Sequence, residues 1–97
     1  MIRADVIASR TLIIEGRPDL KVEVLLFTPE PWGSDYQCRY QIVGIGDEQI
    51  RSAYGVDTVH ALQLALRILP SHLALLKQEY PGLHWLEDDP TGDLGFD

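Results

Sequence analysis

The sequence predicts an α+β fold, in which a four-stranded antiparallel meander is followed by one long helix packed on one face and by an irregular acidic C-terminal tail. Two observations predict this class. Hydrophobic residues recur at every second position in four segments of the first half, as they do in half-buried strands. After Tyr54 the period changes to that of an amphipathic helix. We expect a single domain over residues 1–82, with a tail over residues 83–97 packed on it or extending from it.

The first two strands are expected to form a hairpin. The even positions of residues 4–14 are apolar, with Arg10 as the exception, and this pattern predicts one long strand bent near Arg10. Residues 15–19 have the composition of a turn, and residues 20–26 alternate again.

Residues 28–35 separate this hairpin from the rest of the sheet. Two prolines and a glycine predict a loop there, because proline cannot donate to a strand ladder. Residues 36–42 form the third predicted strand, with Cys38 facing the core, and a short fourth strand covers residues 50–54.

The second face of the predicted sheet is not uniformly polar. Either an exposed face tolerates a few residues of high strand propensity, or that face is a dimer seam or a groove for a partner. Its apolar residues are Ile7, Ile13, Leu25, Phe27, Val43 and Ile45.

A helix is expected to begin directly after the fourth strand. Gly55 gives the backbone freedom to leave the strand, and Asp57 or Thr58 suits the N-cap, where a side-chain oxygen accepts hydrogen bonds from free N–H groups of the first turn. Pro81 and Gly82 end the helix.

One apolar stripe runs along this helix at spacings of three and four residues. It passes Pro70 without losing phase, which favours one helix kinked at Pro70 over a break with a restart at Ser71. The apolar arc spans about 220°, wider than contact with one sheet requires, so we expect the tail or a second subunit to cover its flank. The stripe comprises Val59, Leu62, Leu66, Leu69, Leu73, Leu76 and Tyr80, and the flank comprises Leu64, Ile68 and Leu75.

The net charge of −7 is unevenly distributed. Residues 1–77 hold nine of the 15 acidic residues and all eight basic ones, whereas residues 78–97 hold the other six acids and no base. Such a tail either keeps the protein soluble or docks a basic partner. Docking is favoured because large apolar side chains are interleaved with the acids. The residues that we single out for this contact are Trp85, Glu87, Asp88, Asp89 and Asp93.

The sequence has no pattern typical of a catalytic or metal site. The three histidines lack metal-ligand spacing, and His60 falls on the polar side of the helix as a solvated residue. Burial of Cys38, the single cysteine, disfavours its thiolate. The acidic run at 87–93 lacks the spacing of a calcium loop. We therefore expect no cofactor, no metal and no enzymatic activity.

Charge and hydropathy also exclude two kinds of partner. Nucleic-acid binding needs clustered Lys and Arg side chains, which this chain lacks. Uninterrupted apolar runs are only a few residues long, and the first residues are charged where a signal peptide is apolar, so we expect no membrane association. A cytoplasmic location is expected because no cysteine pair marks an oxidising compartment.

Residues 55–66, with the sequence GVDTVHALQLAL, resemble a recurrent segment G-V-D-x-x-x-A-L-x-L-A-L in a family of small uncharacterised bacterial proteins, a domain of unknown function. Trp85 and residues 92–96 are similar to that family's ending. The resemblance implies a fold of strands followed by a helix and brings no catalytic residues. The structural positions that it implies are Gly55, Asp57, Leu62 and Leu66.

We expect this chain to bind another protein. The acidic tail favours an immunity or antitoxin-like role, in which the chain sequesters a basic bacterial toxin, by analogy of size and charge with immunity proteins. The alternative is a homodimer without catalytic activity, whose self-interface is the extra apolar surface of the sheet or of the helix flank.

Overall fold

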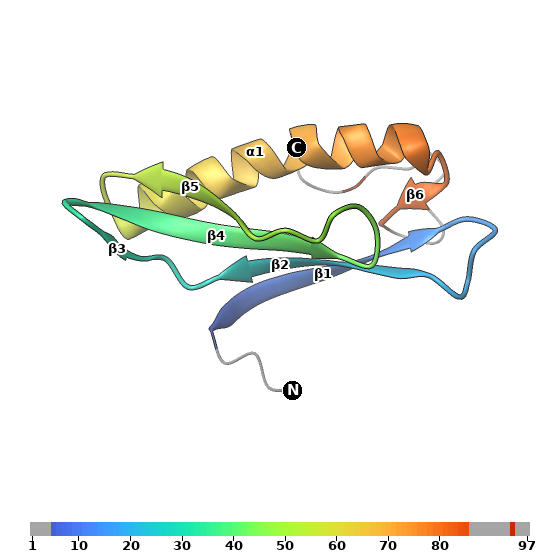
Figure 1. The fold of residues 1–97 in the computed structure, drawn as a ribbon, viewed down its shortest axis with the longest axis horizontal. Coiled ribbons are helices and arrows are strands. Elements are labelled where there is room, and N and C mark those ends of the chain that lie inside the picture. The colour runs from blue at the N-terminus through green and yellow to red at the C-terminus, as the bar shows by residue number, and fades with distance from the viewer. Residues whose placement is uncertain (1–4, 86–93, 95–97) are drawn as a thin grey trace.

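The computed structural model describes residues 5–85 and Leu94, and it shows an antiparallel sheet with one helix across one face (Figure 1). The α+β class is confirmed. The elements in chain order are β1 (Val6–Ile14), β2 (Lys21–Phe27), β3 (Glu30–Trp32), β4 (Asp35–Val43), β5 (Arg51–Gly55), α1 (Thr58–Glu79) and β6 (Leu83–His84).

The four predicted strands correspond to β1, β2, β4 and β5, which pair consecutively as antiparallel neighbours. Two short strands join them: β3 pairs with β4, and β6 pairs with the end of β1. The sheet of the described residues therefore has six strands rather than four. Its order is β3-β4-β2-β1-β6, and β5 lies on the other edge of β4.

The loop predicted for residues 28–35 is confirmed only at residues 28–29 and 33–34, because residues 30–32 form β3, which continues the line of β2. Leu26 pairs with Tyr40 and Pro31 with Tyr36, so five steps along β2 and β3 match four steps along β4. The extra residue is absorbed near Thr28, as in a β-bulge. Proline is compatible with this place because β3 has no second neighbour among the described strands, and an edge strand can leave its N–H side unpaired.

A second irregularity lies in β1. Val6 pairs with Phe27 but Ala8 pairs with Leu26, so the register shifts at Ile7. The predicted bend near Arg10 is therefore misplaced, since Arg10 pairs regularly with Val24.

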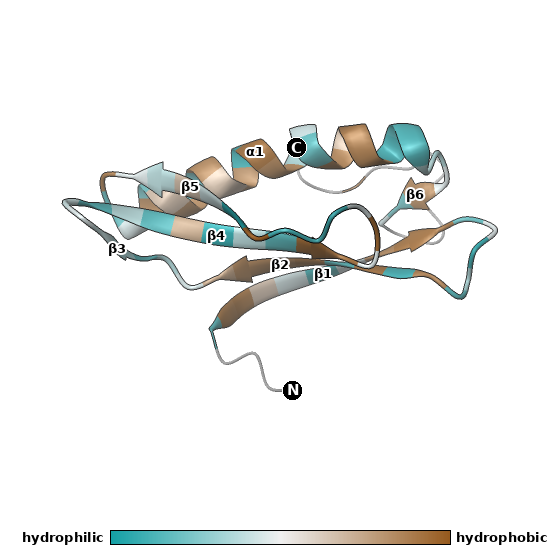
Figure 2. Cartoon of the chain, in the orientation of Figure 1, coloured by the Kyte–Doolittle hydropathy of each residue, from teal (hydrophilic) through white to brown (hydrophobic). Residues whose placement is uncertain are grey.

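The core lies between the inner face of the sheet and α1. Most inward-facing residues of β1, β2 and β4 are buried as predicted, and Figure 2 shows hydrophobic residues gathered on β1, β2 and α1. In β5 the parity shared by the four segments would turn Ile50 and Tyr54 inward, and this is wrong: Ala53 pairs with Cys38 and is buried, whereas Ile50 and Tyr54 are exposed. Cys38 is fully buried, and Ile45, which was expected on the second face, belongs to this core. Leu25 and Phe27 are buried on the second face itself, and Ile7 there is exposed.

The helix is continuous through Pro70, but its buried row differs from the predicted stripe. Leu69, Leu73 and Leu76 are buried as expected, whereas Val59 is 62% exposed and Leu66 is 37% exposed. Small side chains let the first turns lie close to the sheet, and they take the place expected for the larger stripe residues. The buried row is Ala61, Ala65, Leu69, Leu73 and Leu76.

The start of α1 depends on the predicted Gly55–Asp57 motif. The Asp57 carboxylate accepts a hydrogen bond from the N–H of His60 at 2.7 Å, which confirms it as the N-cap. The His60 ring also accepts a bond from the N–H of Val56, 3.0 Å from Nδ1, so His60 is a capping residue rather than a merely solvated one. A Cβ on Gly55 would lie 2.4 Å from the backbone N of Ala61. Gly55 is therefore required for close approach of the helix, not for unusual backbone angles.

At 22 residues, α1 is long and apolar enough to cross a membrane by length and composition alone. The prediction from short apolar runs overlooked this. The core helix of a globular domain passes the same test, and α1 packs one face on the sheet.

Candidate protein-binding surface

Trp85, the aromatic residue of the predicted docking tail, packs onto the domain. The guanidinium carbon of Arg10 lies 3.8 Å from the centre of a Trp85 ring, and Arg10 NH1 donates to the carbonyl of Leu94 at 3.2 Å. Trp85 and Leu94 both contact the core residues. These contacts explain why a charged residue occupies an inward position of β1: Arg10 ties Trp85 and Leu94 to the sheet.

The acidic residues predicted for the same contact, Glu87, Asp88, Asp89 and Asp93, lie outside the described residues. Trp85 is the one predicted contact residue that the structure places, and it is partly buried against its own domain.

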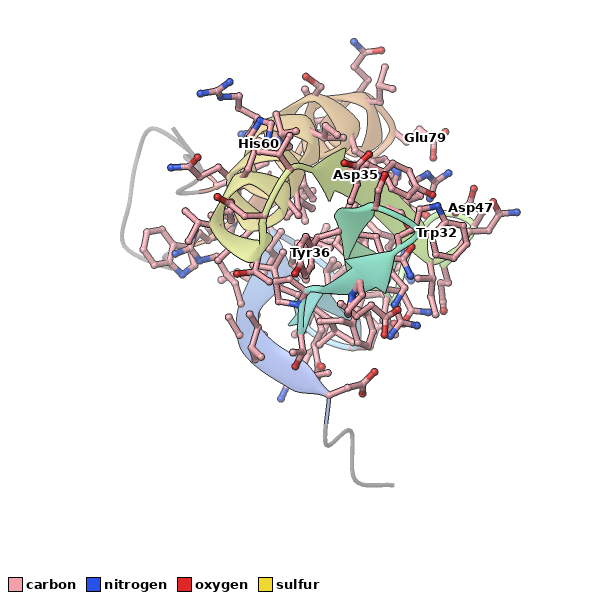
Figure 3. All side chains as sticks on the ribbon, turned by 90° about the vertical axis from the view of Figure 1, so that its left-hand side faces the viewer. Trp32, Asp35, Tyr36, Asp47, His60 and Glu79 are labelled. Carbon is pink, nitrogen blue, oxygen red and sulfur yellow. The ribbon has the colours of Figure 1, made fainter. Side chains whose placement is uncertain are left out.

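A different aromatic pair is exposed on the outer face of the sheet. Trp32 at the β3–β4 turn is 56% exposed and Tyr54 on β5 is 49% exposed, and their ring centres are 6.1 Å apart. Figure 3 shows Trp32 on the outer side of the hairpin, whereas Tyr36 points into the space between sheet and helix. We call this region the Trp32 surface; it comprises Asp5, Glu30, Trp32, Asp35, Gln37, Arg39, Ser52 and Tyr54.

The backbone at this surface is held by a tight turn. Trp32 pairs with Asp35, so the hairpin turn consists of two residues, and Gly33 has a φ of +61° that suits glycine. Sequence reasoning missed Trp32 because two prolines favoured a loop. A glycine turn flanked by Trp32 and Tyr36 was the signal of a hairpin.

A chain of polar contacts fixes the side chains beneath the aromatic pair. Gln37 is 8% exposed; its amide Nε2 donates to Glu30 Oε1 at 2.6 Å, and its Oε1 accepts from Ser52 Oγ at 3.3 Å. Each partner on a neighbouring strand therefore restrains the Gln37 amide. Such restraint lowers the entropy that the surface loses when a partner binds.

Arg39 extends the same network toward β1. Its Nε lies 3.3 Å from Glu30 Oε1, close enough for an ion pair but without hydrogen-bond alignment, and its NH2 lies 3.4 Å from Asp5 Oδ2. The guanidinium also lies over the Phe27 ring, 5.4 Å from its centre. Phe27 is buried on the outer face in part by this stacking, so Arg39 both covers apolar area and neutralises charge.

The Trp32 surface carries a local negative charge. Asp5, Glu30 and Asp35 contribute three carboxylates and Arg39 contributes one guanidinium, which gives a formal charge of −2. Trp and Tyr side chains are enriched in protein-binding hot spots, and carboxylates such as those of this surface are typical of the polar rim around them.

A second polar cluster lies where β5 begins, beneath α1. Arg51 NH1 and NH2 donate to the two Asp47 oxygens at 3.0 and 2.8 Å, and the Asp47 pKa is held well below its usual range by this pair and by the Gln49 N–H. Burial lowers the pKa of the His72 imidazole, with a further contribution from Arg51, against which Asp47 acts. The ring lies edge-on to the buried Tyr40 at 6.1 Å.

The described part of the chain offers neither an activated thiol nor a cluster of metal ligands. Burial raises the pKa of the Cys38 thiol, so the thiol stays protonated, and its Sγ lies 3.5 Å from the carbonyl of Phe27. Over residues 5–85 and Leu94, no three His, Cys, Asp or Glu side chains converge in a way that would hold a metal ion.

A family model matches residues 8–97, nearly the whole chain. The chain belongs to that family. Its description is "Domain of unknown function (DUF6968)", which confirms the resemblance to uncharacterised proteins. No curated protein and no solved structure matches the chain.

Within this DUF6968 chain, the positions implied by the resemblance have different roles. Gly55 and Asp57 form the strand-to-helix junction, Leu62 packs partly against the core, and Leu66 lies largely outside it. The expectation that Leu66 belongs to the buried helix face is therefore wrong.

Proposed function

We propose that this protein binds a basic protein partner through the Trp32 surface. The observation that carries the proposal is the exposed Trp32–Tyr54 pair, held on a short hairpin above a network of hydrogen bonds and ion pairs. Trp, Tyr and Arg dominate the binding energy of protein interfaces, and a restrained surface loses little entropy on binding.

The partner's charge follows from the charge of the surface. The Trp32 surface has a formal charge of −2 in a protein of −7. A basic partner would be attracted at long range, and association would slow as salt screens that attraction.

In its specific form, the proposal is an immunity or antitoxin-like protein that neutralises a cognate bacterial toxin. Acidic side chains over a positively charged active site would block its substrate, and an aromatic anchor would hold the complex. This role requires no catalysis by the protein itself.

The test uses the protein encoded by the gene next to that of this chain. We expect it to bind the full-length chain in isothermal titration calorimetry, and co-expression to suppress its toxicity. Trp32→Ala should weaken binding by about 30-fold or more, the equivalent of a hot spot of about 2 kcal/mol. Val59→Ala is the matched control, because Val59 is similarly exposed but lies on the helix.

Two results would contradict the proposal. Absence of binding by the unmodified chain at high micromolar concentration would remove the partner. Equal affinities for the unmodified chain and Trp32→Ala would remove the Trp32 surface as the docking site.

A further inference from the structure

The free edge of β5 is the least protected edge of the sheet. β5 pairs with β4 on one side, and no described strand pairs with its other side. An exposed edge presents unpaired N–H and C=O groups that can pair with another strand, and proteins block such edges with proline, charge, bulges or cover.

The other edges carry these protections. Pro31 interrupts β3. β1 has the register shift at Ile7, and Arg10 ties the C-terminal residues to it. In β5, residues 52–55 contain neither proline nor charge, and the Arg51 guanidinium is already held by Asp47.

An apolar flank of α1 lies above the same edge. His72 contacts Tyr40 and is influenced electrostatically by Arg51, which places the His72 side of the helix over the start of β5. Ile68 and Leu75 lie one turn before and one turn after His72, on that side. They are 43% and 63% exposed, and Figure 1 shows β5 running directly below α1. We call β5 together with this flank the β5 seam; it comprises Ile50, Arg51–Gly55, Val56, Leu64, Ile68 and Leu75.

The charge of the protein decides which occupant suits the seam. Two copies of a chain with a net charge of −7 repel each other. This repulsion is weakest where the two surfaces that meet carry no excess of acidic residues. Among the described residues, the acids that border the β5 seam lie at its two ends: Asp47, which is paired with Arg51, and Glu48 precede β5, and Asp57, which caps the helix, follows it. Antiparallel pairing of two β5 strands would bring the Arg51 end of one copy to the Asp57 end of the other.

The available area is of the right order for a self-interface. A helix of 22 residues is about 33 Å long and a strand of five residues is about 17 Å long, and each layer is roughly 10 Å deep. That gives on the order of 500 Å² per copy, or about 1,000 Å² in total, which is the lower end for a specific interface.

We propose that two copies of this chain associate through the β5 seam, with antiparallel β5–β5 pairing across a two-fold axis and the Ile68 and Leu75 side chains of both copies buried in the interface. Such an interface is closed, because the same surface is used on each copy, so it stops at the dimer. It leaves Trp32 exposed, although Ser52 and Tyr54 belong to both surfaces.

The test measures the mass of the full 97-residue chain by sedimentation equilibrium from about 1 to 200 µM. We expect the mass to rise from 10.9 kDa toward twice that value. Ile68→Glu and, separately, Leu75→Glu should each weaken association at least tenfold, because each introduces a carboxylate into the apolar interface of both copies. Val59→Glu is the matched control, since Val59 is exposed on the opposite flank of the same helix and should leave association unchanged.

Hydrogen exchange of the β5 amides gives an independent measurement. The amides of residues 51–55 that point away from β4 should exchange more slowly at 200 µM than at 1 µM. Circular dichroism confirms that each variant is folded, and the second glutamate variant keeps the test valid if one of them is not.

A mass of 10.9 kDa at every concentration would overturn the dimer. A dimer that persists in both glutamate variants, with unchanged exchange in β5, would overturn the β5 seam as its location. Trp32→Ala should leave the mass unchanged, so failure of this inference and failure of the partner-binding proposal are distinguishable.

Discussion

The sharpest prediction concerns Gly55, where the last residue of β5 lies under the first turn of α1. A Cβ at this position would be 2.4 Å from the N of Ala61, and it would also crowd His60 C at 2.8 Å and Ala61 Cα at 2.9 Å. All three atoms are backbone, so no side-chain rotation relieves the overlap. The helix start and the strand must separate by about 1 Å to restore ordinary contact.

Whether Gly55→Ala raises or lowers the free energy of unfolding tests whether close approach of the helix is what requires glycine. The Gly55 φ lies outside the left-handed region, so alanine there would by itself stabilise the fold by about 0.4–1 kcal/mol through the unfolded chain. Separation by 1 Å instead forfeits a quarter to a half of the packing attraction around the fully buried Ala61 and Ala65. Overpacking costs about 1–3 kcal/mol, and contact with backbone places Gly55→Ala near the upper end.

The assay is urea unfolding followed by far-ultraviolet circular dichroism. We expect Gly55→Ala to lower the free energy of unfolding by about 3 kcal/mol, a large part of the roughly 5–15 kcal/mol typical of a domain, with a melting temperature lower by about 12–24 °C. Gly33→Ala is the control: it has open space but a φ of +61°, so it should cost only about 1 kcal/mol. A Gly55→Ala variant as stable as the parent, or more stable, would refute the close-approach argument.

Two further predictions concern the helix. Asp57→Ala removes the acceptor for the His60 N–H and should lower stability by about 1 kcal/mol in the same urea assay, whereas Asp57→Asn should retain most of it; equal losses would contradict the capping role. The pKa of His72 is lower in the folded protein than in the unfolded chain, so the unfolded chain binds the proton first as pH falls. The contribution of His72 to stability is therefore complete above its unfolded pKa of about 6.5, and it is lost as pH falls toward the folded pKa. Stability measured from pH 7.5 to 5 should therefore fall less in His72→Phe than in the parent, and identical profiles would rule out His72 as a source.

Local patterns specified most of the elements because each one depends on near neighbours. Alternation located β1, β2, β4 and β5, although it assigned the wrong face of β5 to the core, and the Gly55–Asp57 motif located the start of α1. The α+β class and the antiparallel meander follow from these elements and their short connections.

Pairing across the sheet decided what local patterns missed. Pro31 is incompatible with a central strand but not with an edge strand. Only the tertiary structure showed that this segment pairs with β4 as an edge strand. Arg10 is charged at an inward position because Trp85 and Leu94 return to cover it from more than seventy residues away.

The sequence by itself determined the class, the strand-to-helix junction and the uneven charge, since these depend on residue type and on spacing along the chain. Only the tertiary structure decided the rest. It buried Ala61 and Ala65 in place of Val59 and Leu66, because the rotation of a helix is set by how closely its backbone approaches the sheet. It also moved the candidate contact from Trp85 to Trp32, because exposure is a property of the whole fold: Trp85 packs on its own domain, and Trp32 does not.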